Sequence, residues 1–448
     1  MRRVLFHSYH FPPTGGSGVQ RPARMVRHLP EFGYEPIVVT APGPTEERWT
    51  PIDDALNLRV PDGTMVRRVA GPEPPSSTGW RHRGERWLRL RDPWTRSWID
   101  GSTRLGIDAA REAGVDLVYA WMQPYASAEA AARIAAAIDR PWVADLGDPW
   151  ALDEMMIYPT RLHSWLERRL MRRVLGTASA IVLSTPEAAR RVRAAFPELA
   201  DKIVVAIPNG FDAEDFTSEP PARTDDAFRI VHTGYLHTDL GHRQRRTALL
   251  RHLVGGAVPG VDIIGRSHLF LIEAVERLRR ERPELGQRLE VHFAGVLSPQ
   301  DLEVARRSPA SRIHGFVSYD ESRALMRTAD LLFLPMHGLP SGVRATVVPG
   351  KTYEYVASGR PILAAVPAGD ARDLLSAAGT ASLCAPSDVD GIAAAIVGAY
   401  ERSRAGRTPP PPPAELLERY EWSGLARRLA AVFDEIPVAA RTTARVAA

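Results

Sequence analysis

Apolar runs of strand length alternate with helical patterns along most of this chain, and the alternation occurs twice. The first series extends from residues 4–11 to 203–207, and the second from 228–234 to 381–384. Strands that alternate with helices form a parallel sheet covered by helices. Because a single hydrophobic core seldom serves more than about 250–300 residues, and the chain has 448, the pattern predicts two doubly wound α/β domains.

The connecting segments divide the chain further. A polar stretch around Pro220-Pro221 separates the two series, and five prolines before the last helical pattern predict a stiff spacer. Ligands of open α/β sheets bind beyond the carboxyl ends of the strands, so two such domains predict a cleft between them. The predicted segments are a first domain (1–215), a linker (216–227), a second domain (228–408) with an inserted loop or lid (238–265), a spacer (409–413), a final helix (414–437) and a frayed tail (438–448).

Composition excludes several classes of protein. Lys and Arg number 57 against 53 Asp and Glu, a near balance that does not indicate nucleic-acid binding. The lone Cys384 excludes an internal disulfide and a cysteine-rich zinc site, and the histidines do not cluster with acids at metal-ligand spacing. The first apolar run is interrupted at His7 and Pro12-Pro13, and no window approaches the roughly 20 apolar residues that cross a bilayer. We therefore expect a cytoplasmic protein that needs no metal.

A short segment near residue 350 combines a helix start, a cation and a carboxylate. Pro349 suits the first turn of a helix, whose free N–H groups favour a diphosphate. Lys351 and Glu354 are three residues apart and therefore share one helix face. On that face an ammonium can meet phosphate oxygens while a carboxylate accepts ribose hydroxyls, which predicts a nucleotide-sugar pocket. An exposed ion pair on an ordinary helix is the alternative.

Three further segments are candidate binding elements. Residues 12–21 form a glycine-rich turn that opens onto a helix and lets a ligand approach the backbone, although the spacing fits neither a dinucleotide fingerprint nor a P-loop, and a structural tight turn is the alternative. Asp145 and Asp148 follow an apolar strand, where one of them can touch an acceptor, unless Asp148 only caps a turn. Arg266 precedes a helix and is a candidate phosphate contact or a solvated surface arginine.

Arginine and tryptophan gather in two stretches of the first domain. Residues 80–98 interleave six arginines with four tryptophans, and residues 161–174 repeat leucines at helical spacing beside an arginine strip. Both stretches suit an anionic membrane surface, at which the protein would sit peripherally on the inner face. A helix with a solvated arginine face is the alternative interpretation of the second stretch.

Taken in order, the motifs of this chain resemble those of the family-4-like glycosyltransferases of the GT-B fold. The resemblance implies two Rossmann-like domains that face each other across a cleft, with the acceptor in the first, a nucleotide-activated sugar in the second, and a final helix, with Trp422, that crosses back to the first. The motifs are residues 12–18, 145–150, 207–212, 232–234, 292–295, 314–317 and 351–355.

The resemblance also implies roles for individual residues. It implies donor contacts from Gly16, Gly18, Gly234, Arg266, Val347, Val348, Lys351 and Glu354, acceptor contacts from Gln20, Arg21, Asp148 and Trp150, and catalytic roles for Asp145, Asp148, Arg266 and Lys351. Many family members carry a further glutamate eight positions before the ribose glutamate, where this chain has Thr346. We interpret that departure as the character of a subgroup.

The expected reaction moves a glycosyl group from a nucleoside-diphosphate sugar to a hydroxyl or amine, without a cofactor and with retention at the anomeric carbon. The acceptor is a glycan, a lipid-linked intermediate or a natural product, and the sequence does not distinguish these. A non-catalytic scaffold that keeps the fold, or a sugar-nucleotide epimerase with a similar fold, are the competing interpretations. The sequence does not indicate an oligomeric state.

Overall fold

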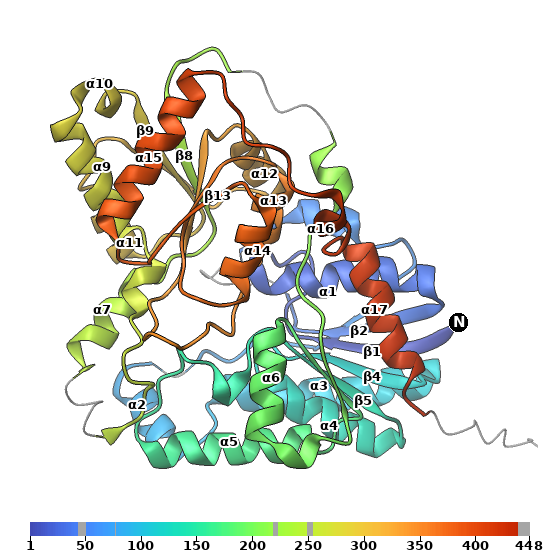
Figure 1. The fold of residues 1–448 in the computed structure, drawn as a ribbon. Coiled ribbons are helices and arrows are strands. Elements are labelled where there is room, and N and C mark those ends of the chain that lie inside the picture. Colours follow the sequence, from blue (N-terminus) through green and yellow to red (C-terminus); the bar gives the residue numbers. More distant parts are fainter. Residues whose placement is uncertain (44–50, 77, 218–222, 249–253, 438–448) are drawn as a thin grey trace, which may run out of the picture.

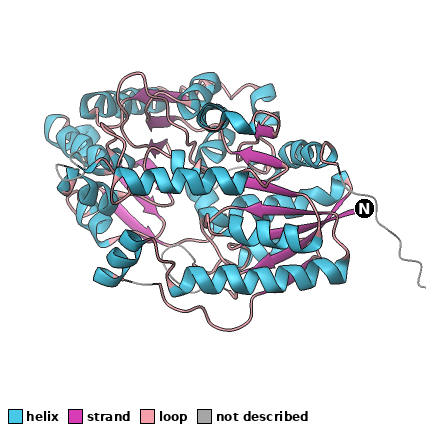
Figure 2. Ribbon diagram, turned by 90° about the horizontal axis from the view of Figure 1, so that it is seen from below, coloured by secondary structure: helices cyan, strands magenta, loops and turns pink. Residues whose placement is uncertain are grey.

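The computed structural model describes residues 1–43, 51–76, 78–217, 223–248 and 254–437, and it contains two parallel β-sheets (Figure 1). The first sheet has the strand order β3-β2-β1-β4-β5-β6-β7 and the second β10-β9-β8-β11-β12-β13. Every pairing between neighbouring strands is parallel. Figure 2 shows both sheets flanked by helices, so the predicted pair of doubly wound α/β domains is confirmed.

The first domain differs from the sequence prediction by one additional strand. β3 at the sheet edge is short and has no alternation of apolar and polar residues, which is why its sequence does not indicate a strand. The elements of this domain are β1 (Arg2–Ser8), α1 (Ser17–His28), β2 (Tyr34–Thr40), η2 (Asp54–Arg59), β3 (Met65–Arg68), α2 (Gly79–Leu88), α3 (Pro93–Ala113), β4 (Leu117–Trp121), α4 (Ser127–Ile138), β5 (Trp142–Leu146), η3 (Trp150–Leu152), α5 (Arg161–Leu175), β6 (Ala180–Leu183), α6 (Pro186–Ala195), β7 (Ile203–Ala206) and η5 (Ala213–Phe216).

The second domain repeats the same architecture. Its elements are β8 (Phe228–Thr233), α7 (Thr238–Arg246), η6 (Ile263–Arg266), α9 (Leu269–Glu281), α10 (Pro283–Gly286), β9 (Leu289–Ala294), α11 (Pro299–Ala305), β10 (Ser311–Gly315), α12 (Tyr319–Arg327), β11 (Leu331–Pro335), α13 (Lys351–Ala357), β12 (Ile362–Ala365), α14 (Asp370–Ala378), β13 (Ala381–Cys384) and α15 (Val389–Arg404). β1 and β8 each lie inside their sheet at the point where the strand order reverses. The loops that follow these two strands therefore occupy the usual ligand position of such sheets.

The end of the chain returns to the first domain. Helix α17 (Trp422–Asp434) buries Trp422, Leu425 and Phe433 in the same core as Phe6 of β1, and Figure 1 shows it beside α1. The single final helix predicted over 414–437 is wrong, because α16 (Ala414–Glu418) and α17 are separate. At the break the backbone pairs with Phe211 instead of continuing the helix. The N–H of Phe211 donates to the carbonyl of Tyr420, and the N–H of Trp422 donates to the carbonyl of Phe211.

The segment interpreted as an inserted loop or lid is partly helical. In α7 the side chain of Gln244 donates to the carbonyl of Val261 and accepts from the N–H of Ile263. Gly241 lies so close to Ile264 that a Cβ would come within 2.6 Å of its Cα. These contacts hold α7 against η6, so the predicted loop or lid over 238–265 is a helix over Thr238–Arg246, and its role as a lid stays a prediction. The carbonyl of Gly256 then accepts from the N–H of Tyr158 in the first domain, so the segment bridges the two domains.

The arginine and tryptophan stretch over 80–98 does not form one surface. Trp98 is buried and donates to Ser127, and the half-buried Trp94 donates to Glu73, so these two tryptophans pack in the interior, whereas Arg91 and Arg96 are exposed. Helix α2 in the first half buries no residue. No helix among the described residues has the length and apolar character needed to span a membrane. The predicted tail over 438–448 and Pro220-Pro221 of the linker lie outside the described residues.

Candidate functional site

Two cations of the second domain come together although 85 positions separate them in the sequence. Arg266 ends η6 and Lys351 begins α13, and the charge of Arg266 contributes to the lowered pKa of Lys351. The Lys351 Nζ lies 3.2 Å from the Nε2 of His232 at the end of β8. Gly234 follows that strand with φ +94°, and a Cβ there would lie 3.0 Å from Nζ. Gly234 therefore provides both the turn and the space that the lysine requires.

Neither of these cations forms an ion pair with a carboxylate in the described parts of the chain. Burial, with a contribution from Arg266, lowers the pKa of Lys351 to about 7. Burial also lowers the pKa of Arg266, although Asp148, Asp153 and Glu154 attract its charge. Buried charges are normally paired, and an adjacent pair of cations without a bound acid is a site for a di-anion such as a diphosphate.

Carboxyl groups of the first domain face this cationic pair from the loop after β5. Asp148 is half-buried, and burial raises its pKa while Arg266 opposes that shift. Burial and the neighbouring Asp148 raise the pKa of Asp153 to about 8. A carboxyl group with a pKa near 8, such as that of Asp153, holds or releases a proton near neutral pH. Asp148 is thus the sequence-predicted residue that the structure brings near Arg266 from the first domain.

Asp145 and Arg21 lie beneath the site. Both side chains are buried, with the Arg21 guanidinium 2.8 Å from the Asp145 carboxylate, and the same guanidinium donates to the carbonyl of Pro208. Tyr119 donates its hydroxyl to Asp145 as well. The sequence predicted an acceptor contact for Arg21 and a catalytic role for Asp145. Neither role fits side chains that are this deeply buried. The pair instead ties α1, β5 and the segment near residue 208 together.

Trp150 is likewise a supporting residue. Its side chain is buried, its indole N–H donates to Glu167 on α5 at 2.9 Å, and its ring stacks on Tyr125 at 5.3 Å between centroids. The backbone of Trp150 has φ 47°, a left-handed conformation that costs free energy in a non-glycine residue. The predicted acceptor contact therefore does not fit Trp150, which shapes the loop that carries Asp148.

The glycine-rich turn closes the first domain side of the cleft. Gly16 has φ 92° and precedes α1. A Cβ on Gly18 would lie 2.8 Å from His10, so no larger residue fits without displacing that ring. Gln20 is half-buried on α1. The turn thus packs tightly against the end of β1, and its predicted contacts with donor and acceptor stay predictions.

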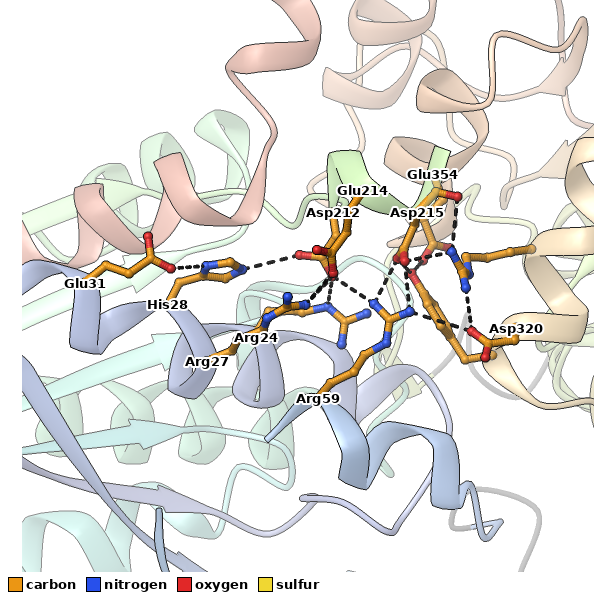
Figure 3. Close-up of polar contacts among 12 residues, drawn as sticks. Arg24, Arg27, His28, Glu31, Arg59, Asp212, Glu214, Asp215, Asp320 and Glu354 are labelled. Atoms are coloured by element: carbon orange, nitrogen blue, oxygen red, sulfur yellow. Dashed lines mark hydrogen bonds and ion pairs between the residues drawn. The ribbon is translucent and has the colours of Figure 1, made fainter. Parts of the chain in front are cut away.

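Glu354 lies in an interdomain network of charged groups (Figure 3). The Tyr319 hydroxyl lies 3.0 Å from the Glu354 Oε1 and 2.9 Å from Asp215. Because a hydroxyl has one proton to donate, only one of these carboxylates receives it at a time. Burial raises the pKa of Glu354, although the Tyr319 hydrogen bond opposes that shift. Three guanidinium groups surround the Tyr319 ring, those of Arg24, Arg59 and Arg323.

The network joins the two domains through the segment that links them. Arg24 on α1 pairs with Asp212, Arg59 with Asp215 at 2.8 Å, and Arg323 on α12 also with Asp215 at 2.7 Å. The carboxylates of η5 and its N-cap therefore bind arginines from both domains at once. Glu354, a half-buried candidate ribose ligand, is connected to this junction through Tyr319.

A carboxylate of the first domain occupies the place where the sequence lacks the second glutamate. The Glu154 carboxylate accepts from the N–H of Thr346 at 3.0 Å and from its hydroxyl at 2.6 Å, and it also contacts His337 and Arg191. Burial opposes ionisation, but the hydrogen bonds from His337 and Thr346 outweigh it and lower the pKa of Glu154 to about 2. The neighbouring Val347 and Val348 are buried.

Sequence reasoning missed Glu154. It lies 192 positions from Thr346 and belongs to no motif, and the only available signal is the cluster of acids that follows β5. Among the described residues, no group of three or more His, Cys, Asp or Glu side chains is placed to hold a metal ion.

Comparisons with known proteins place these features in a family. Residues 15–210 match the family described as "Glycosyl transferase 4-like domain", and residues 264–402 match "Glycosyl transferases group 1". A glycogen synthase of Mycobacterium tuberculosis is 30% identical over 172 residues, which are 36% of this chain and 38% of that enzyme. The chain thus spans well under half the length of that relative.

Solved structures share the fold over nearly the whole chain. Anabaena Alr3699/HepE, solved in complex with UDP and glucose, has a TM-score of 0.60 at 15% identity and covers 97% of this chain and 100% of its own. The sucrose-phosphate synthase of Thermosynechococcus elongatus has a TM-score of 0.63 at 14% identity, with 97% of this chain and 98% of its own covered.

Proposed function

Because the chain belongs to the family-4-like glycosyltransferases of the GT-B fold, we propose that it transfers a sugar from a nucleoside-diphosphate sugar to an acceptor hydroxyl or amine, with retention of anomeric configuration and without a metal. The observation that carries this proposal is the half-buried pair of Arg266 and Lys351, neither of which forms an ion pair with a carboxylate in the described part of the structure. A departing nucleoside diphosphate brings the charge that this pair lacks.

The donor is held at two points in this proposal. Arg266 and Lys351 contact the diphosphate and stabilise the negative charge that builds on it as the glycosidic bond breaks. The Glu354 carboxylate accepts hydrogen bonds from the ribose hydroxyls, and Tyr319 keeps that carboxylate in place. Gly234 leaves room for the sugar-bearing phosphate beside the lysine.

Asp148 acts on the acceptor side. Its half-buried carboxylate faces Arg266 from the first domain, so an acceptor hydroxyl that binds it lies next to the leaving diphosphate. Attack on the same face that the diphosphate leaves gives retention, and Asp148 orients the hydroxyl or takes its proton. Closure of the two domains, held by the Glu154 contacts with Thr346, excludes water and limits hydrolysis of the donor.

A nucleotide panel tests the donor half of the proposal. Thermal unfolding of the purified protein is measured with UDP, GDP, ADP, dTDP and CDP sugars, with UDP-glucose first because HepE was also solved with that ligand. A ligand present at about 100 times its Kd stabilises the native state by about 2.7 kcal/mol. We expect one nucleotide class to raise the Tm and Glu354→Ala to abolish that rise. Glu435→Ala, at the exposed residue that follows α17, should leave the rise intact.

The same samples separate the competing functions. Release of nucleoside diphosphate, slow without acceptor and faster with one, supports transfer. Conversion of the donor to its epimer without acceptor identifies an epimerase, and binding without any turnover identifies a scaffold. No change of Tm with any nucleotide sugar contradicts the proposal.

A further inference from the structure

The helix α2 exposes an unusual amount of apolar surface. Trp80 is 81% exposed, Trp87 61% and Leu88 69%, and Leu90 just beyond the helix is also exposed. Single exposed apolar side chains are ordinary in soluble proteins. Trp80 and Trp87, however, are seven positions apart and therefore project from the same face of the helix. A ten-residue helix that buries none of its residues gains little stability from packing, and a helix of this length is only marginally stable in water by itself.

Helix α5 extends this surface. His163 on α5 bonds to the carbonyl of Trp87 at 2.8 Å through its Nε2, and the Arg86 guanidinium donates to the carbonyl of Ile157 just before α5. Figure 1 shows the two helices along the same lower edge of the molecule. α5 adds two more exposed apolar side chains, Leu162 and Trp165. We call this combined surface of α2, Leu90 and α5 the Trp–Arg face.

Arginines surround the apolar groups of the Trp–Arg face. The acids of its two helices are already engaged, Glu85 with Arg81 at 3.1 Å and Glu167 with Trp150 and Arg89. The surface therefore carries an excess of positive charge. Its exposed arginines are Arg81, Arg83, Arg86, Arg89, Arg161, Arg168, Arg169, Arg172 and Arg173.

We propose that the Trp–Arg face docks onto a bilayer surface that contains anionic lipids. Tryptophan and leucine side chains insert at the boundary between headgroups and acyl chains, while guanidinium groups bind the lipid phosphates. A hollow of about 260 Å³ beside Trp165 has room for a phosphate-bearing headgroup. Three arginines and one acid line it, and the acid, Glu198, pairs with Arg172 at 3.4 Å, which leaves Arg168 and Arg169 for a phosphate. The charge of the rim and the apolar centre together match a lipid surface.

Glu167 connects the Trp–Arg face to the loop that carries Asp148. Glu167 on α5 accepts from the indole of Trp150 and lies 3.5 Å from the Arg89 guanidinium, so it joins the Trp–Arg face to the loop that carries Asp148. Docking would hold the acceptor side of the cleft near the membrane. This proposal does not depend on glycosyl transfer, because vesicle binding requires neither donor nor acceptor.

Vesicle co-sedimentation tests the proposal with the full chain. The probes are vesicles of phosphatidylcholine alone and of an equal mixture of phosphatidylcholine and phosphatidylglycerol. We expect binding to the mixed vesicles that weakens with added salt, and little binding to phosphatidylcholine. Arg83→Ala combined with Arg168→Ala should weaken binding by about fivefold for each arginine. Trp80→Ala combined with Trp165→Ala should weaken it by at least about tenfold.

Control variants remove exposed arginine and apolar side chains that lie outside the Trp–Arg face. Arg280→Ala combined with Arg306→Ala removes two exposed arginines of the second domain, and Leu58→Ala removes a side chain on η2 that is 89% exposed. Both controls should bind as the unchanged protein does. Thermal unfolding of each variant checks that it is folded, which is expected because every changed side chain is exposed.

Three outcomes would overturn the proposal. They are no binding to the mixed vesicles at low salt, equal binding to both kinds of vesicle, and binding that the Trp–Arg variants and the control variants share. A concentration-dependent dimer that Trp80→Ala with Trp165→Ala abolishes, in the absence of vesicle binding, would assign the face to a second copy of the chain instead.

Discussion

The pKa of Lys351 predicts that nucleotide-sugar binding depends on pH in a defined direction. In the empty cleft, burial and the nearby Arg266 lower this pKa from 10.5 to about 7. A bound diphosphate places negative charge beside Nζ and restores the protonated form. The affinity should therefore be highest below pH 7 and should fall as the pH rises, because the free protein then loses the proton that binding requires.

The size of the effect follows from the same pKa. Below pH 7 most of the protein carries the charged lysine, and binding needs no proton uptake. Above pH 7 the charged fraction falls roughly tenfold for each pH unit, so the Kd should rise by about the same factor between pH 7.5 and 8.5. Each binding event should then take up close to one proton. Loss of a proton from Asp153, whose pKa is about 8, adds negative charge and weakens binding in the same direction.

Two measurements check this prediction. Calorimetric titration with the nucleotide sugar that gives the largest Tm shift, repeated in buffers of different ionisation enthalpy, gives both the Kd and the proton uptake. The sequence contains only one other lysine, Lys202, so carbon-13 labelling of lysine gives two ε-methylene signals and the pKa of Lys351 can be followed directly. Lys351→Met should remove most of the proton uptake, whereas Lys202→Met should leave it unchanged.

The reasoning would be refuted by a flat affinity between pH 6.5 and 8.5 in the unchanged protein. A Lys351 signal that titrates near 10 without ligand would refute it as well, because the empty cleft would then not disfavour the charge. Proton uptake that persists in Lys351→Met would assign the effect to another group, with Asp153 the first to examine.

Three further predictions concern the residues around the cations. Glu354→Gln should weaken nucleotide-sugar binding at least about tenfold through loss of charged hydrogen bonds to the ribose, and an unchanged Kd in titration calorimetry contradicts that role. Glu154→Gln should lower the free energy of unfolding by about 3 kcal/mol at pH 7, measured with urea. Because the pKa of Glu154 in the folded protein is about 2, below the usual 4.5, this stabilisation is complete above pH 4.5 and disappears as the pH falls toward 2. A difference in unfolding free energy between the variant and the unchanged protein that does not shrink over that range argues against the prediction. Asp145→Asn leaves Arg21 buried without its partner and should cost about 3–5 kcal/mol, whereas Asp139→Asn at the exposed end of α4 is the control, and a loss below about 1 kcal/mol for Asp145→Asn shows that the pair is unimportant.

Local patterns carried much of the fold and part of the site. The alternation of strands and helices depends on neighbours in the sequence, so the two sheets were predictable while the edge strand β3, which lacks the pattern, was not. The common face of Lys351 and Glu354 follows from the helical repeat alone. The donor contact of Gly234 was implied by the family resemblance alone, and it stays a prediction.

The sequence by itself therefore determined two doubly wound domains and one helix face that carries a cation and a carboxylate. Only the tertiary structure decided which charged residues are available to a ligand. It buried Asp145 with Arg21, left Asp148 at the cleft, and brought Glu154 to Thr346 across 192 positions. The physical reason is that burial and ion pairing depend on which side chains meet when the two domains close, and neither a motif nor a periodic pattern records a contact between residues so far apart.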